Sequence, residues 1–466
     1  MTDLDLVVSL RKNERYRTLW DTRPDYRETI AALARKYRGE PEPSKTRADG
    51  IIPQVVVAGH VATWTGYGRI GLWVGRSLEA LGIPVGFYGS LNAPPGFLSD
   101  DQFVIDRVVD RMPASAVVVD MGILPWWQNG TEPLNRTVVF TMHESSTITE
   151  ATVKRLNQAR AVVVPCQFNA DTFKACGVTN SIHVVPLGVD PAEGFTPKPW
   201  REQPLTFGMA GRLWHGGCRK GINEGAAAFL KAFPTEDVRL RIKVFPDCLQ
   251  YLAIPSDPRI EVNTEPMSPP VMAEWCGSCD VGLIPSKGEG FGLHSVEMMA
   301  CERPIIAAMQ TGTAQFFTPD CGWILDGEWQ QAEQVYVGWG EWFVPSEASM
   351  ITAMRAVYSD RSEVRRRGAN AAKRAAEFTW GRMGEGLWNV LAGLGLLPQP
   401  PTSPHQPTPV HTNPYQSPPA PANGHALDPC PHRHPIAGCS CWHCGLLVTR
   451  VTREVCLDCD LRPATP

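Results

Sequence analysis

Short apolar runs alternate with longer stretches of helical periodicity from Ile51 onward, a pattern typical of parallel strands connected by helices. The runs form two series, separated by a proline-rich stretch at residues 190–203. This stretch has neither the strand nor the helix periodicity, and we interpret it as a hinge. The first series predicts strands at 55–59, 116–120, 137–141 and 161–165. The second predicts strands at 205–211, 239–245, 281–285 and 304–308. The sequence therefore predicts two α/β domains.

Helical periodicity predicts helices at 25–38, 69–81, 293–301, 348–377 and 381–397. In a two-domain architecture the last of them could return to the first domain. The next segment, residues 398–425, contains ten prolines and no Asp, Glu, Lys or Arg, so it reads as an extended linker. A separate module of residues 426–466 is expected beyond it.

The composition makes some classes of function and location less favourable than others. A formal charge of -4 over 466 residues gives no general attraction to nucleic acid or to anionic membranes. No apolar run reaches the roughly 20 residues of a membrane helix, so we expect a cytoplasmic protein. Eight cysteines scattered between Cys166 and Cys321 are expected to be small buried side chains in a reducing compartment.

Six further cysteines gather in the terminal module. Eleven residues separate the pair Cys441 and Cys444 from the pair Cys456 and Cys459, a spacing that favours a structural zinc ribbon. Disulfide-forming or reactive thiols are the alternative. A second candidate metal site comprises Cys430, His432, His434 and Cys439. The module has four basic and four acidic residues, so it lacks the basic surface typical of nonspecific DNA binding. Docking of a protein or recruitment of the acceptor are equal alternatives.

The segment Glu289-Gly-Phe-Gly-Leu-His-Ser-Val-Glu297 lies between a predicted strand and a predicted helix. Parallel sheets bind ligands at the carboxyl ends of their strands, where helix N-termini offer N–H groups to phosphate oxygens. The two carboxylates can accept hydrogen bonds from sugar hydroxyls. Positive charge for the phosphates is expected from Arg212 and Lys220, with Arg219 as a competing candidate.

Several motifs occur together in one order. They are Pro186-Leu-Gly-Val-Asp190, Gly211-Arg212, Lys220-Gly221, Glu289–Glu297 and Phe378-Thr-Trp380. With these motifs the chain resembles the retaining glycosyltransferases of family four, over roughly residues 51–395. It departs from the family in three places. Seven residues separate Arg212 and Lys220, slightly more than in relatives, and Glu302 stands where relatives often carry glycine. The stretch Thr311-Gly-Thr-Ala-Gln315 lacks the Gly-Gly pair and the downstream Glu often found in relatives.

The resemblance implies a GT-B fold, an α/β architecture of two Rossmann-like domains facing a cleft. Residues 51–198 would form the acceptor-side domain, residues 199–380 the nucleotide-sugar domain and residues 381–397 the return helix, with residues 1–50 as an N-terminal extension. The donor would be a nucleotide-diphosphate sugar, and no catalytic metal is predicted. Transfer would retain the anomeric configuration, with a hydroxyl group of unknown identity as the acceptor.

The resemblance also implies roles for single residues. Glu289 would bind the transferred sugar and Glu297 the nucleotide ribose, while Arg212 and Lys220 would hold the diphosphate. The remaining donor-side residues would be Phe291, Gly292 and Leu293. The opposing wall would comprise His143, at the sugar, together with Gly66, Tyr67, Gly68 and Arg69.

The sequence thus predicts a hexosyltransferase. Two alternatives remain: a catalytically weak transferase-like scaffold carrying a zinc adaptor, and a glycosyltransferase acting on nucleic acid. For single residues, the structural alternatives are a tight turn without ligand contact at 59–68 and a purely structural role for His143.

Overall fold

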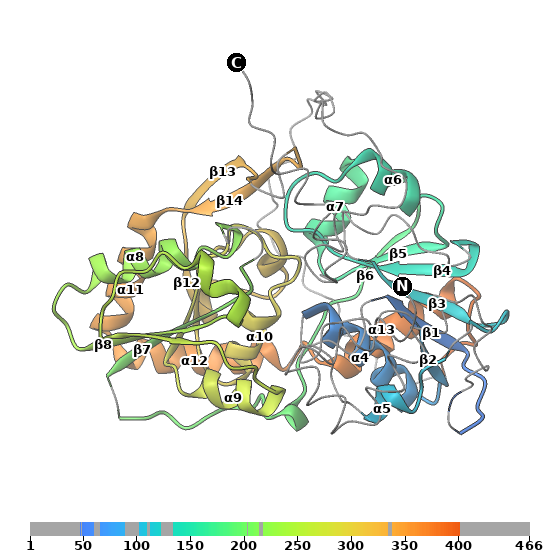
Figure 1. Ribbon diagram of the computed structural model, residues 1–466, viewed down its shortest axis with the longest axis horizontal. Helices are drawn as coiled ribbons and strands as arrows, with labels where there is room; N and C mark the ends of the chain where they lie inside the picture. The colour runs from blue at the N-terminus through green and yellow to red at the C-terminus, as the bar shows by residue number, and fades with distance from the viewer. Residues whose placement is uncertain are drawn as a thin grey trace, which may run out of the picture.

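The computed structural model describes residues 47, 49–59, 66–88, 102–109, 112–122, 134–202, 204–213, 218–333 and 338–400. Within these ranges two lobes lie side by side, each with helices packed around a parallel six-stranded sheet (Figure 1). The predicted helix at 25–38, the linker beyond residue 400 and all proposed zinc ligands lie outside the described residues. The predicted α/β architecture with two parallel sheets is confirmed.

The first lobe has the strand order β2-β1-β3-β4-β5-β6. Its strands are β1 (Val55–Gly59), β2 (Val85–Tyr88), β3 (Val117–Met121), β4 (Thr137–Phe140), β5 (Ala161–Val164) and β6 (Ile182–Val184). Its helices are α4 (Gly66–Ala80), α5 (Gln102–Ile105), α6 (Glu150–Leu156) and α7 (Gln167–Ala175). The sequence predicted the four central strands, which are continuous apolar runs because both of their faces are buried.

The second lobe has the strand order β12-β11-β10-β7-β8-β9. Its strands are β7 (Leu205–Ala210), β8 (Val238–Lys243), β9 (Ile260–Asn263), β10 (Val281–Ile284), β11 (Ile305–Ala307) and β12 (Gly322–Ile324). Its connecting helices are α8 (Ile222–Ala232), α9 (Pro269–Gly277) and α10 (Leu293–Ala300). The strands that the sequence missed, β2, β6, β9 and β12, are the edge strands of the two sheets. Partial exposure weakens the apolar pattern of β6, β9 and β12, whereas β2 is buried except at Tyr88.

Two features differ from the sequence-based expectation. An antiparallel hairpin of β13 (Gly327–Gln331) and β14 (Glu341–Pro345) was not predicted, and it reaches from the second lobe towards the first (Figure 1). The single helix predicted at 348–377 is two helices, α11 (Glu347–Ser359) and α12 (Arg361–Ala375). The break occurs because Asp360 leaves the helical conformation and caps α12, accepting hydrogen bonds from the backbone of Ser362 and Glu363.

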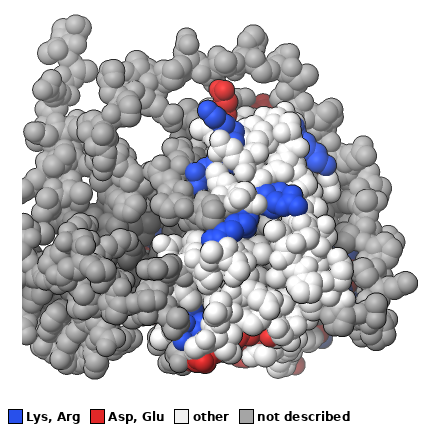
Figure 2. All heavy atoms as spheres, turned by 90° about the vertical axis from the view of Figure 1, so that its right-hand side faces the viewer, with Lys and Arg blue, Asp and Glu red and all other residues white. Residues whose placement is uncertain are grey.

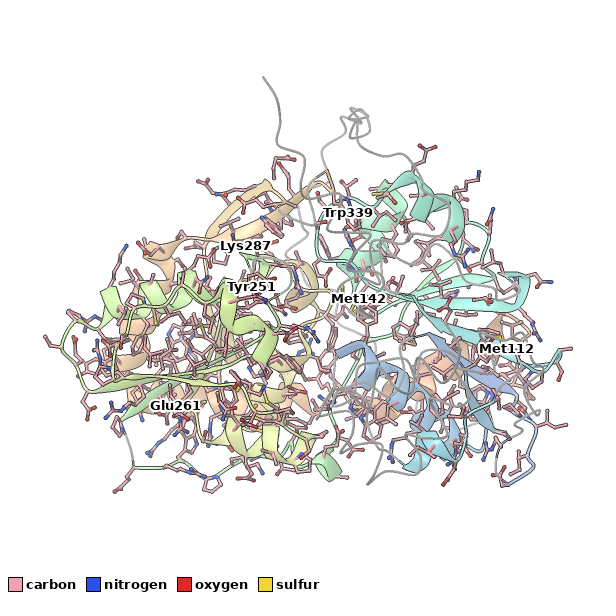
Figure 3. All side chains as sticks on the ribbon, in the orientation of Figure 1. Met112, Met142, Tyr251, Glu261, Lys287 and Trp339 are labelled. Atoms are coloured by element: carbon pink, nitrogen blue, oxygen red, sulfur yellow. The ribbon has the colours of Figure 1, made fainter. Side chains whose placement is uncertain are left out.

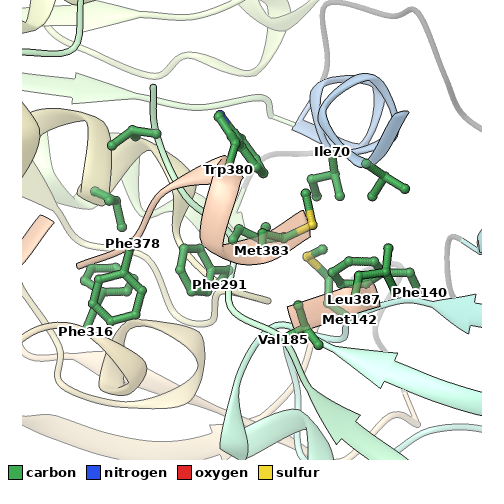
Figure 4. Packing of buried hydrophobic residues seen from close by; sticks show 14 of the residues in the cluster. Ile70, Phe140, Met142, Val185, Phe291, Phe316, Phe378, Trp380, Met383 and Leu387 are labelled. Atoms are coloured by element: carbon green, nitrogen blue, oxygen red, sulfur yellow. The ribbon is translucent and has the colours of Figure 1, made fainter. Parts of the chain in front are cut away.

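The last helix, α13 (Trp380–Gly393), returns to the first lobe as expected. Ser77 in α4 donates to the carbonyl of Trp380 at 2.8 Å, and the rings of Trp73 and Trp380 stack with centroids 5.8 Å apart. One hydrophobic cluster runs across the junction between the lobes and contains Met142 of the first and Phe291 of the second (Figure 4). The lobes therefore share a core at this point.

The described cysteines of the two lobes are free thiols, and all but Cys176 are buried. Cys276 and Cys279 lie in the core, so the expectation that they serve packing is confirmed. Burial raises the pKa of Cys166 and of Cys279 to about 12, which makes these thiols unreactive. Among the described helices, none is long and apolar enough to cross a membrane.

Candidate active site between the lobes

The motif with both candidate carboxylates begins at the carboxyl end of the second sheet, with Glu289 in the loop between β10 and α10 and Glu297 within α10. Gly292 caps α10 with a φ of 95°, a left-handed conformation that favours glycine. The helix then begins at Leu293, and its first N–H groups lie beside the loop. The motif thus has the geometry of an anion-binding strand-to-helix junction.

This loop touches the other lobe directly. A side chain at Gly288 would overlap with the carbonyl of Glu144, and one at Gly290 would lie 2.5 Å from Met142. Figure 3 places Met142 at the junction of the lobes. The absence of a Cβ at both positions lets the backbone of the loop approach the segment that contains His143.

Glu289 is surrounded by basic side chains from its own lobe. Its Oε1 accepts from Lys220 Nζ at 2.6 Å, and its Oε2 lies 3.7 Å from Arg219. Burial alone would raise the pKa of Glu289, but the charges of Lys220 and Arg219 outweigh it, and the pKa is lowered. Arg219 also lies 3.7 Å from Glu144 of the first lobe. The structure thus places Lys220 and Arg219 beside Glu289.

Glu297 is held by a cation from the opposite lobe. Its Oε1 accepts from Arg69 Nη1, and Arg69 Nη2 donates to Glu193 at 2.7 Å. Burial opposes ionisation of Glu297, but Arg69 and His294 lower its pKa. In Glu193, by contrast, burial prevails over Arg69 and raises the pKa. Arg69 is thus a half-buried bridge from α4 to α10 and to the hinge.

His143 follows β4 and is fully buried. Its Nε2 lies 2.7 Å from Ser145 Oγ, and its carbonyl accepts from Asn169 at 2.6 Å. Burial lowers the pKa of His143 to about 4, so the ring is neutral at physiological pH. A neutral imidazole can bind a hydroxyl group without adding charge to the site.

Two of the departures from the family pattern have positive φ, 62° at Glu302 and 55° at Thr311. Glycine adopts this backbone without the strain that other residues have there. Thr311 gains a contact in exchange, because its Oγ1 accepts from the N–H of Glu289 at 3.0 Å. The next residue, Gly312, donates its N–H to the carbonyl of Glu289 at 2.8 Å. The backbone of Glu289 is therefore fixed from both sides.

The space beside Glu289 is small. A cavity lined by Lys287, Glu289, Thr311 and Thr313 has a volume of about 10 Å³, enough for about one water molecule. All the residues that line this cavity belong to the second lobe.

The outer face of the first lobe differs from the buried junction. Figure 2 shows that, on the described part of this face, Lys and Arg side chains stand singly or in pairs among uncharged atoms. A nucleic acid is bound by a dense row of cations, which this view does not show there.

Other predicted site residues occupy defined places. Tyr67 donates its hydroxyl to the carbonyl of Met142 at 3.3 Å, and Gly66 and Gly68 belong to the first turn of α4. Arg212 pairs with Asp247 at 2.8 Å and lies over the ring of Phe245. The ring of Phe291 packs against Phe316 and Phe378, with centroids 5.1 and 6.2 Å away. Only the backbone of Phe291 is therefore placed to line a ligand.

Sequence reasoning missed Glu193, Ser145 and Trp339. Glu193 lies in the stretch interpreted as a hinge. Only its short distance to Arg69 in the structure shows that it shares this cation with Glu297. Ser145 follows His143 by two positions, which is a usable signal for a hydrogen bond to the ring. Trp339 lies in the hairpin segment, where the turn glycines Gly338 and Gly340 were the available signal.

Comparisons with known proteins agree with this geometry. Residues 170–387 match the family described as "Family 4 Glycosyltransferase in conflict systems". The D-inositol 3-phosphate glycosyltransferase of Kineococcus radiotolerans is 30% identical over 235 residues, which are 44% of this chain and 50% of that protein. The chain thus spans about half the length of the curated relatives it matches.

Solved structures show the same fold. Sucrose-phosphate synthase from Thermosynechococcus elongatus superposes with a TM-score of 0.55 at 14% identity, covering 74% of this chain and 99% of that one. Anabaena HepE, solved with UDP and glucose, has a TM-score of 0.50 at 15% identity and covers 73% and 99%. This chain therefore has the GT-B fold, and its residues 170–387 are similar to the family 4 glycosyltransferases.

Proposed function

We propose that this chain is a retaining glycosyltransferase that moves a hexose from a nucleotide-diphosphate sugar to a hydroxyl acceptor. The observation that carries the proposal is the loop from Glu289 to Glu297, with Lys220 and Arg219 on one side and His143 across the junction. The similarity to family 4 enzymes and the UDP found with HepE support the donor class. The scaffold and nucleic-acid alternatives gain no support from these comparisons.

In this proposal Glu289 accepts hydrogen bonds from the hydroxyls of the transferred sugar, and Glu297 from the ribose. Lys220 and Arg219, now paired with Glu289, would shift towards the diphosphate and stabilise the negative charge that develops on it. His143 would bind the sugar from the other lobe. The amides at the start of α10, from Gly292 and Leu293, would add hydrogen bonds to the phosphates.

Transfer is tested with a panel of UDP- and GDP-linked hexoses, by measuring donor-dependent nucleotide release and the anomeric configuration of the product. Glu289→Gln should lower turnover about 100-fold, the order of magnitude for loss of one transition-state contact. Glu274→Gln is the matched control, because Glu274 forms an exposed ion pair with Lys198 in the same lobe. Turnover that is absent in the wild type, or equal in both variants, would contradict the proposal.

We also propose that the terminal module holds a structural zinc ion through Cys441, Cys444, Cys456 and Cys459 and docks the acceptor or a protein. The cysteine spacing supports this, with Cys430, His432, His434 and Cys439 as a second set. Metal analysis of the full chain should find about one or two zinc ions, and Cys441→Ser should release one. A chain without zinc would refute the ribbon.

A further inference from the structure

The guanidinium group of Arg219 lies between carboxylates of the two lobes. Its Nη1 donates to the carbonyl of Gly288 at 2.6 Å and lies 3.7 Å from Glu289 Oε2, both in the second lobe. Its Nη2 lies 3.7 Å from Oε1 of Glu144 in the first lobe. Of these three contacts only the one to Gly288 has the length of a hydrogen bond, so the two carboxylates attract the cation mainly by their charge.

The main chain keeps Arg219 and Glu144 close together. The carbonyl of Arg219 accepts from the N–H of Lys287 at 2.8 Å and from the hydroxyl of Ser286 at 3.3 Å. Gly288 lies so close to the first lobe that a Cβ there would overlap with the carbonyl of Glu144. The side chains of Arg219 and Glu144 are each 17% exposed, so water screens their attraction less than it screens a surface pair.

The charges of four side chains balance at this contact. Arg219 and Lys220 are the two cations, and Glu144 and Glu289 are the two anions. Burial lowers the pKa of Lys220, whereas the charges of Glu289 and, more weakly, of Glu144 raise it. Glu144 therefore acts on both cations. A diphosphate group would add negative charge beside them, so it and Glu144 would compete for the same positive charge.

We infer that Glu144 is a positioning residue that draws Arg219 towards the first lobe and competes there with the diphosphate of the nucleotide. The inference rests on the proposed function for the presence of that diphosphate. Binding of the donor would move the cation from Glu144 to the phosphates, and departure of the nucleotide would return it. Glu144 thereby weakens nucleotide binding and favours product release, a step that limits turnover in many enzymes.

The competition is measured first by calorimetric titration of the full-length chain with UDP and GDP. Glu144→Gln keeps the shape of the side chain and removes its charge, so it should tighten binding of the preferred nucleotide about tenfold. Binding of uridine and guanosine, which have no phosphates, should not change. Glu150→Gln is the matched control, because it removes an exposed negative charge from the start of α6 in the same lobe. A nucleotide affinity that is unchanged or weaker in Glu144→Gln would overturn the inference.

The route through Arg219 is measured next with a double-mutant cycle. In a chain that already carries Arg219→Gln, adding Glu144→Gln should change the nucleotide affinity less than about twofold, because the shared cation is absent. An equal gain in both backgrounds would mean that Glu144 repels the phosphates directly, and it would overturn the inference.

The same titrations distinguish the inference from the proposed function. If the wild type transfers no sugar but Glu144→Gln tightens nucleotide binding through Arg219, only the proposed function is contradicted. A wild type that binds neither UDP nor GDP would contradict both.

Discussion

The two carboxylates of one motif, Glu289 in the loop after β10 and Glu297 in α10, are held in opposite ways. Glu289 is neutralised by Lys220 and Arg219, both from its own lobe, whereas Glu297 is neutralised by Arg69 from the other lobe. The pairing of Glu297 therefore depends on contact between the lobes, whereas that of Glu289 does so only through Arg219, which also faces Glu144 of the first lobe. The comparison of Glu289 with Glu297 shows that one motif can contain both a binding group that is already in place and a contact that depends on the relative position of the two lobes.

Breaking the contact between the lobes should have the largest effect. Arg69→Met removes the cation shared by the half-buried Glu193 and the buried Glu297, and leaves only His294 beside Glu297, which should cost about 3–5 kcal/mol of stability. Small-angle scattering should also show a larger radius of gyration, because the lobes lose this bridge. Arg76→Met is the control, since Arg76 lies on the same helix over the rings of Trp73 and Phe103. Equal unfolding midpoints for the two variants would count against the bridge.

Breaking the ion pair between Lys220 and Glu289, which lies within the second lobe, should lower the stability somewhat less. Lys220→Met removes the nearer cation from Glu289 but leaves Arg219 at 3.7 Å, so we expect a loss of about 3 kcal/mol in chemical unfolding. Adding Glu289→Gln removes the stranded charge and should recover most of that stability without recovering transfer. A radius of gyration that rises as in Arg69→Met would show that this pair, too, senses closure.

The dependence of stability on pH should distinguish the titration of His143 from that of Glu289 and Glu297. The pKa of His143 is about 4 in the folded chain and about 6.5 when unfolded, so the unfolded chain binds the extra proton first. Stability should therefore fall as the pH drops from about 6.5 to 4, by about 2 kcal/mol between pH 7 and 5. The lowered pKa values of Glu289 and Glu297 act only below about pH 4.5, which is the usual range of a glutamate.

Denaturant unfolding at several pH values checks this assignment. His143→Gln should flatten the slope between pH 6.5 and 5, while His183→Gln, at a histidine in an edge strand of the same lobe, should leave most of it. A slope unchanged by His143→Gln would mean that another group titrates there.

The sequence predicted the central strands of both sheets and the side of the candidate site that belongs to the second lobe. The central strands and the loop from Glu289 to Glu297 are local patterns, so periodicity and spacing reveal them. The partners of that loop are long-range contacts: Arg69 is 228 residues from Glu297, and Ser145 is 194 residues from Trp339. No local pattern specifies such pairs. The hairpin was missed because its strands are short and partly exposed, with a weak alternation.

The smallest effect on stability is expected from substitution of Arg212. The position predicted for this residue from the motif order differs from its position in the structure. The motif places Arg212 at the phosphates, but its guanidinium pairs with Asp247, a side chain that is 51% exposed. Exposed pairs contribute little, so Arg212→Ala should change stability by less than about 1 kcal/mol. Arg219→Ala removes a cation that faces both Glu144 and Glu289, and it should raise the KM for the donor more than Arg212→Ala does. If Arg212→Ala has the larger effect on KM, Arg212 leaves Asp247 for the phosphates when the donor binds, and the clamp around Glu289 is then also completed by the ligand rather than preformed.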